Sequence, residues 1–166
     1  MIVISDTTPL ITLMKGNELR VLEGMFGEVL IPEAVYNELT SNKSFKSEAE
    51  LIKNSTFIRV VKVTDLDRVS FLQRATGLDR GESEAIIYAD EIKADLLLMD
   101  EAAGRRVAKN MNLQMTGSIG ILIKAFKMGL ITMSEAEDAF EKIRKSNRHI
   151  SDKLFNSALN IIREEE

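Results

Sequence analysis

Four short runs of the sequence are mostly apolar and do not alternate regularly with polar residues. They read IVIS (2–5), EVLI (28–31), FIRVV (57–61) and LLLM (96–99), and LQMT (113–116) is a shorter fifth run. Strands of this kind are buried on both faces, which is typical of a parallel sheet covered by helices on either side. The pattern therefore restricts the chain to α/β folds.

Helical segments are predicted around these runs, as right-handed crossovers between parallel strands require. The predicted helices cover residues 8–22 with a break near 16–17, 32–40, 46–54, 80–93, 101–111, 119–128, 134–145 and 151–163. We predict a three-layer α/β/α fold with a central parallel sheet of four to five strands. Residues 1–166 are expected to form a single domain, with the C-terminal helices (about 134–163) packed on it.

The composition excludes several kinds of chemistry. The 166 residues contain no cysteine, which removes disulfides, thiolate metal sites and cysteine nucleophiles. His149 is the single histidine, so catalysis that needs two histidines is excluded. The net charge of −4 argues against a protein that coats nucleic acid electrostatically, but it allows an acidic pocket that binds cations. No run approaches the ~20 apolar residues of a membrane span, and the N-terminus shows no secretory signal, so we expect a cytoplasmic protein.

Two aspartates follow predicted strands. Asp6 comes after the first run and Asp100 comes directly after LLLM. In open α/β sheets, ligands bind outside the carboxyl ends of the strands, so we expect both side chains at that edge. Each aspartate could instead cap the helix that follows it.

Two glutamates lie on helix faces that should be apolar. Glu38 falls on the predicted buried stripe of the helix at 32–40. Glu82 begins the apolar stripe of the helix at 80–93, whereas Glu84 falls roughly opposite that stripe. Of this last pair, Glu82 is the predicted inward carboxylate.

Both glutamates also have structural interpretations. Asp79 and Glu82 have the spacing of a capping box, in which the Glu82 side chain turns back to the Asp79 amide. Glu38 could extend into solvent or pair with a lysine.

A cluster of these acids would need protons or cations. Two carboxylates ~4 Å apart repel each other by about 4 kcal/mol at an effective dielectric constant of 20. Four of them cannot all remain ionised without compensation. Oxygen ligands without histidine or cysteine select Mg²⁺ or Mn²⁺ rather than zinc. The sequence therefore predicts metal-assisted hydrolysis of a phosphodiester, which needs no protein nucleophile.

Several pieces of the sequence resemble the PIN domains, a family of nucleases that hold Mg²⁺ or Mn²⁺ with three or four acids beside a parallel sheet. They are ISDTTPLI, IPEAVYNEL, LDRGESEAI, LLLMDEAAGRRVA and TGSIGIL, which occur in the family's order across about residues 2–128. Further on, HISDKLFNSALNII is similar to the tail of a PIN-like branch catalogued as a domain of unknown function. The resemblance covers nearly the whole chain.

The resemblance implies a role for each acid. By position, the catalytic and metal-binding residues are Asp6, Glu38, Glu82 and Asp100, with Glu84 as a substitute for Glu82. The third acid is usually aspartate in the related toxin ribonucleases, so Glu82 lengthens that side chain by one methylene.

Other polar residues are candidates for binding substrate. Thr7 could position a metal-bound water or a phosphate oxygen, although it could also simply begin a helix. Arg105 could meet a phosphate bidentately, although a solvated helix face explains it equally well. Ser118 matches the threonine or serine that the family often has after its last strand.

The C-terminal part adds a second basic cluster and an amphipathic helix. Arg144, Lys145, Arg148 and His149 could guide RNA or form a solvated surface. The last helix is expected to pack on the domain, with a dimer or partner surface as the alternative.

We therefore expect a ribonuclease dependent on Mg²⁺ or Mn²⁺ that hydrolyses RNA with a metal-activated water. The resemblance implies a toxin-like role, an antitoxin protein that inserts a basic residue among the acids, and a homodimer. The main alternative is a catalytically silent PIN-like module that binds nucleic acid or protein. A phosphatase or mononucleotide-binding domain is disfavoured, because the turn SDTTPL lacks the glycines that let backbone approach a phosphate.

Overall fold

Five parallel strands form the centre of the structure. In this computed structural model, which describes residues 1–146 and 150–165, they are β1 (Val3–Ser5), β2 (Val29–Pro32), β3 (Ile58–Val61), β4 (Leu96–Leu98) and β5 (Met115–Thr116). The strand order is β3-β2-β1-β4-β5, and every neighbouring pair is parallel. The predicted α/β fold with a parallel sheet is confirmed.

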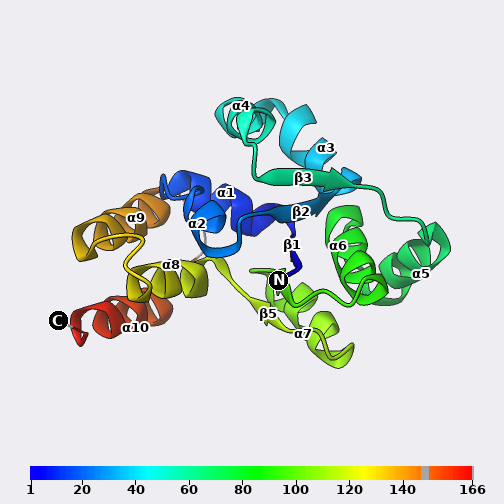
Figure 1. Ribbon diagram of the computed structural model, residues 1–166. Coiled ribbons are helices and arrows are strands. Elements are labelled where there is room, and N and C mark those ends of the chain that lie inside the picture. Colours follow the sequence, from blue (N-terminus) through cyan, green and yellow to red (C-terminus); the bar gives the residue numbers. More distant parts are fainter. Residues whose placement is uncertain (147–149, 166) are drawn as a thin grey trace.

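Helices cover both faces of this sheet. They are α1 (Thr7–Lys15), α2 (Val21–Phe26), α3 (Glu33–Ser41), the 3-10 turn η1 (Lys43–Phe45), α4 (Lys46–Asn54), α5 (Leu66–Thr76), α6 (Arg80–Glu91), α7 (Ala102–Asn110), α8 (Ser118–Lys127), α9 (Met133–Lys145) and α10 (Asp152–Arg163). Figure 1 shows α1, α2, α8, α9 and α10 on one side of the sheet and α5, α6 and α7 on the other. The structure thus has the predicted three-layer architecture, with helices on both sides of the sheet.

The two faces of the sheet support two separate apolar cores. Val3 and Leu98 pack into the core beneath α1 and α8, whereas Ile4 and Leu97 pack into the core beneath α6 and α7. Successive side chains of a strand point to opposite faces, so a strand with a core on each side must be apolar at every position. This explains why the strand runs do not alternate.

The C-terminal helices pack against the first core. Helix α9 contacts α1, and α10 contacts α8 and α9. Phe140 of α9 and Phe155 of α10 meet edge to face, with ring centroids 6.3 Å apart. Within the described part of the chain, no helix has both the length and the apolar character that crossing a membrane requires.

One helix was not predicted, and the second part of the helical stretch predicted over 8–22 was misplaced, because α2 runs from Val21 to Phe26. Helix α5 lies between β3 and α6, and it buries only Val69 and Leu72, so its apolar periodicity is weak. It is held at its ends by Asp65, which accepts a hydrogen bond from the Arg68 amide, and by Gly77 at a φ of 75°. These local end signals define the helix better than its apolar residues do.

Candidate active site

The sheet brings Asp6 and Asp100 to the same edge. Strands β1 and β4 are parallel neighbours, with Ser5 opposite Leu98. The Asp6 amide donates a hydrogen bond to the Leu98 carbonyl at 3.1 Å, and Asp100 lies two residues beyond Leu98. Both aspartates therefore follow the carboxyl ends of central strands, as predicted.

Asp6 is enclosed among other acids. Its side chain is buried, and it makes no capping hydrogen bond although Asp6 occupies the N-cap position of α1. Burial raises the pKa of Asp6 well above its usual range, a hydrogen bond from the Thr7 amide opposes the shift, and the nearby carboxylates of Glu82, Asp79 and Glu38 add to it. A capping role therefore does not explain this carboxylate.

Glu38 reaches the same edge from α3. Its Oε2 accepts a hydrogen bond from Thr7 Oγ1 at 2.9 Å. The missing side chain of Gly81 makes room here, because a Cβ at this position would lie 3.1 Å from Glu38 Oε2 and 3.6 Å from Asp6 Oδ1. Partial burial raises the pKa of Glu38, and the carboxylates of Asp79 and Glu101 add to the effect.

The predicted burial of Glu38 was wrong. Helix α3 buries only Val35 and Leu39, and Glu38 is exposed at its margin. The helical spacing gave the correct side of α3, but the apolar stripe is too narrow to cover Glu38.

Glu82 has a structural partner and one unpaired oxygen. It forms the predicted capping box with Asp79: the Asp79 amide donates to Glu82 Oε2 at 3.0 Å, and the Glu82 amide donates to Asp79 Oδ1 at 2.8 Å. Its other oxygen, Oε1, is buried without a hydrogen-bond donor. Burial raises the pKa of Glu82 to about 7, and the carboxyl groups of Asp79 and Glu101 contribute to the shift. Glu82 thus caps α6 through Oε2, while its Oε1 remains part of the acidic cluster.

Glu84 lies in a different environment from the predicted one. It is as buried as Glu82, because packing encloses nearly the whole of the first two turns of α6. Its Oε2 accepts a hydrogen bond from the Ala34 amide at 2.9 Å, and its Oε1 accepts one from Arg80 Nε at 3.1 Å. The expectation that Glu84 faces away from the buried side was wrong, and its carboxylate fixes the first turn of α3.

Asp100 is held by Ser118. The Ser118 amide and Oγ donate to the two oxygens of Asp100 at 2.6 and 2.9 Å. Arg105 Nη1 donates to the Met99 carbonyl at 2.9 Å, and its charge lies near the carboxylate. Burial raises the pKa of Asp100, while Ser118 and Arg105 oppose that shift. The structure therefore groups three residues that were selected separately from the sequence.

Glu101 is a member of the cluster that the sequence analysis missed. Its Oε1 accepts a hydrogen bond from Thr8 Oγ1 at 3.1 Å, and its carboxyl group raises the pKa of both Glu82 and Glu38. The carboxyl group of Asp79 also raises the pKa of Glu82 and Glu38, so Asp79 belongs to the cluster too. The signal for Glu101 was its position directly after Asp100, where a second acid also follows the strand.

The second basic cluster is only partly described. Arg148 and His149 lie outside the described residues. Arg144 lies over the Phe155 ring, with its guanidinium carbon 5.0 Å from the ring centroid, and Lys145 is exposed. Arg144 is thus partly used to hold α10 against α9.

The donor chemistry of the acidic cluster fits a hard divalent cation. All of its side-chain ligands would be carboxylate oxygens, one buried oxygen of Glu82 has no donor, and Gly81 leaves space between Glu38 and Asp6. As the side chains of the described residues lie, however, no three His, Cys, Asp or Glu residues are grouped closely enough to hold a metal ion. The cluster therefore has suitable ligands in an arrangement that is not closed around an ion.

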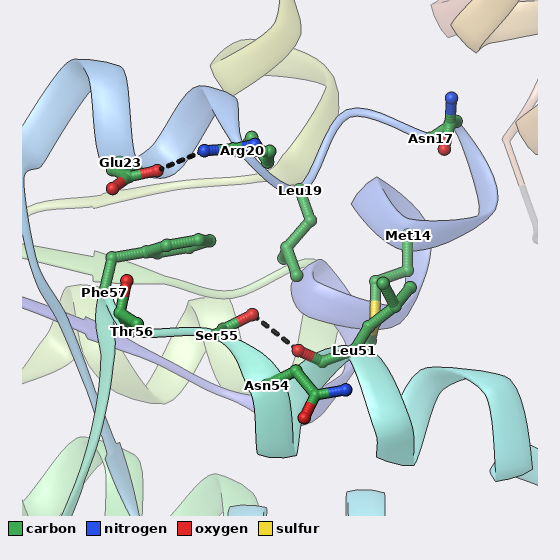
Figure 2. Close-up of a pocket in the computed structure, with 10 residues that line it drawn as sticks. All are labelled: Met14, Asn17, Leu19, Arg20, Glu23, Leu51, Asn54, Ser55, Thr56 and Phe57. Carbon is green, nitrogen blue, oxygen red and sulfur yellow. Dashed lines mark hydrogen bonds and ion pairs between the residues drawn. The ribbon is translucent and has the colours of Figure 1, made fainter.

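Two cavities border Asp100, and a third is lined by none of the clustered acids. A cavity of about 650 Å³ includes Thr8, Asp100 and Glu101, and one of about 400 Å³ includes Asp100 and Arg105. Figure 2 shows the third, of about 470 Å³, around Leu19, Leu51 and Phe57, with the Arg20–Glu23 ion pair at its margin. A further cavity, of about 610 Å³, includes Glu38, Asp79 and Gly81, so cavities border the acids on both their Asp100 side and their Glu38 side.

Comparison with known proteins gives one result that covers nearly the whole chain. A family model described as PIN domain matches residues 2–164. No curated protein matches the chain.

Proposed function

Because the chain belongs to the PIN-domain family, we propose that it is a ribonuclease dependent on Mg²⁺ or Mn²⁺ that hydrolyses RNA phosphodiesters. PIN domains are generally nucleases and typically use divalent metals. The proposal names RNA as the substrate and the acidic cluster as the catalytic centre.

One observation carries the proposal: carboxylates from separate segments gather at one edge of the sheet, and their pKa values are raised. Glu82 and Glu38 raise the pKa of Asp6, and the carboxyl group of Asp79 raises the pKa of all three. Such a cluster is costly unless protons or cations compensate it. Asp6, Glu38, Glu82 and Asp100 would hold the ion, which would activate a water molecule and stabilise developing negative charge when bound.

The neighbouring residues would position these acids and the substrate. Thr7 orients Glu38, and Ser118 orients Asp100, through the hydrogen bonds described above. Arg105 is fixed to the Met99 carbonyl beside Asp100, and in this proposal its guanidinium contacts a phosphate of the RNA. These contacts hold the polar side chains ready before the substrate binds.

The proposal is tested with purified protein, Mn²⁺ and a panel of RNA molecules. Asp6→Asn and Asp100→Asn should each lower the cleavage rate by at least about a hundredfold, because each removes a carboxylate charge from the reacting centre. Glu84→Gln is the matched control, since Glu84 is acidic and buried but is used to hold α3. Cleavage that persists in both aspartate variants would assign the activity to a contaminant and refute the proposal.

A catalytically silent module is the second candidate, and the arrangement of Asp100 favours it. Both oxygens of Asp100 accept hydrogen bonds from Ser118, and the acids of the described residues are not closed around an ion. Titration with Mn²⁺ separates the two functions. Binding that Asp6→Asn weakens supports the nuclease, whereas no binding at millimolar Mn²⁺ supports the silent module.

A toxin-like role with an antitoxin partner extends the nuclease proposal. Glu38 and Glu101 are exposed at the edge of the acidic cluster, where a basic side chain of a partner could reach them. Induced expression should then stop growth of the host cell, and Asp6→Asn should restore it. Growth arrest by both forms would separate toxicity from nuclease activity.

A further inference from the structure

Two cavities meet at a shared boundary beside Asp100. The larger one, of about 650 Å³, has the hydroxyl groups of Thr8 and Thr12 in its wall. The smaller one, of about 400 Å³, has Arg105 in its wall. Both include Asp100, Ile119 and Leu154, so these three residues lie where the cavities adjoin. Each volume is in the range of about 300–1,000 Å³ that is usual for small-ligand sites.

Leu154 is an exposed apolar side chain on a firmly anchored helix. It lies in the first turn of α10 and is 47% exposed, whereas the next residue, Phe155, is buried against Phe140. The contact between Arg144 and the Phe155 ring fixes the same turn. Leu154 is therefore presented at the boundary by a rigid support, and Ile119 provides a buried apolar base there.

One basic residue lines the smaller cavity, and others are sequence neighbours of lining residues. Arg105 lines the smaller cavity, and the exposed Arg106 follows it on α7. Lys153 precedes Leu154, and Lys145 precedes Ser146, which lines the larger cavity. A polyanion that crosses both cavities would thus meet the Arg105 side chain in the smaller cavity, and the acids in the cavity walls are Asp100 and Glu101.

We propose that the two cavities receive two consecutive unpaired nucleotides of the RNA, with Leu154 as an apolar wedge between their bases. This inference rests on the proposed nuclease function, because it places the phosphate between the two nucleotides next to Asp100. Apolar side chains such as leucine separate stacked bases in other nucleic-acid complexes. Bases in an RNA duplex are stacked and paired and cannot enter separate cavities, so the site selects single-stranded RNA.

The test measures binding separately from cleavage. Fluorescence anisotropy follows a labelled single-stranded RNA, and the same strand annealed to its complement, on the Asp6→Asn background so that cleavage does not interfere. Leu154→Ala should weaken binding of the single strand by about tenfold, the loss expected from removing one apolar contact. Leu154→Met should retain most of the binding. Ile161→Ala is the matched control, because Ile161 is 38% exposed on the same helix but lies outside both cavities.

Two outcomes would overturn the inference: equal binding of the single strand and the duplex, or a Leu154→Ala variant that binds like Ile161→Ala. Circular dichroism confirms that each variant is folded. Failure of the proposed function would look different. In that case the unmodified protein cleaves no RNA with either metal, while binding still depends on Leu154.

Discussion

At the scale of residues, two glutamates of one helix have the same burial and different uses. Glu82 and Glu84 are both 6% exposed. Both oxygens of Glu84 have donors from Ala34 and Arg80, whereas Glu82 keeps one buried oxygen without a donor and has a raised pKa. Unsatisfied buried oxygens and perturbed pKa values mark functional groups more often than satisfied ones do. The hydrogen-bond partners of the two side chains therefore favour Glu82 as the third acid of the site.

A pair of isosteric substitutions tests that choice. Glu82→Gln should lower the rate of RNA cleavage by at least about a hundredfold, because the charge of a proposed metal-binding carboxylate is lost. Glu84→Gln should leave the rate within about threefold, because a glutamine oxygen can still accept from the Ala34 amide. Initial rates with Mn²⁺ make the comparison, and the reverse order would reassign the third acid to Glu84.

The raised pKa of Glu82 predicts how stability depends on pH without metal. The folded protein holds this proton up to about pH 7, whereas an unperturbed glutamate releases it near 4.5, so folding is favoured at low pH. The stabilisation is complete below pH 4.5, the pKa of this glutamate in the unfolded chain, and it is lost as the pH rises through 7. Urea unfolding with a chelator should show a loss of stability between about pH 5 and pH 8 to which Glu82 contributes at most about 3 kcal/mol, in the same direction as the other acids with raised pKa values. Glu82→Gln should reduce that loss, and an unchanged slope would contradict the prediction.

The acids at strand ends were predictable, but their partners were not. Asp6 and Asp100 follow apolar runs, and parallel strands bring such positions to one edge. The exposure of Glu38 depends on how much of the α3 surface its neighbouring elements cover. Helical spacing does not give the width of that covered surface. The use of Glu84 depends on the start of α3, fifty residues earlier in the chain. Contacts of this range require the folded structure.

At the scale of elements, the N-terminal turn of α6 determines how closely the acids approach one another. Gly81 lies in this turn, and its backbone faces Glu38 and Asp6 directly. Any side chain here would occupy the space between their carboxylates. Gly81 thus links the packing of α6 against α3 to the geometry of the site.

Gly81→Ala should separate ion binding from stability. The added methyl group would lie 3.1 Å from Glu38 Oε2, so it should weaken Mn²⁺ binding by about tenfold or more, in the range found for changes around metal ligands. The better helix propensity of alanine, worth up to about 1 kcal/mol, should largely offset the strain. Gly24→Ala in α2 is the control, because the atoms nearest to its Cβ belong to the Leu130 side chain, at 3.3 Å, and not to an acid. Isothermal titration and thermal unfolding measure both effects, and unchanged Mn²⁺ affinity would show that the ion does not use this space.

The breadth of a helix's apolar face explains which helices the sequence predicts. Helices with a broad apolar face, such as α8 and α9, were predicted to within a few residues. Helix α5 was missed, because Phe71 is exposed and only two residues are buried. The prediction that Asp6 and Asp100 share a sheet edge needed only parallel strands, which the apolar runs indicate, whereas the strand order comes from the structure.

At the scale of the whole molecule, charge is distributed unevenly. The net charge is −4, and the acidic cluster, in which Asp6 and Glu82 are buried, concentrates acidic groups at one edge of the sheet. Folding brings these carboxylates together, so the folded state bears a repulsion that the unfolded chain avoids. Anything that neutralises the edge should stabilise the whole fold.

Divalent ions should therefore stabilise the protein beyond their contribution to ionic strength. At ten times its Kd, an ion that binds only the folded state adds about 1.4 kcal/mol, which raises the Tm of a chain of this size by about 3–6 °C. NaCl of equal ionic strength should give little of this increase. Asp6→Asn should raise the metal-free Tm, because a buried carboxylate among acids is removed, and it should abolish the response to Mn²⁺. Differential scanning calorimetry with chelator, NaCl or Mn²⁺ separates these effects, and an equal response of both proteins to Mn²⁺ would place the ion away from Asp6.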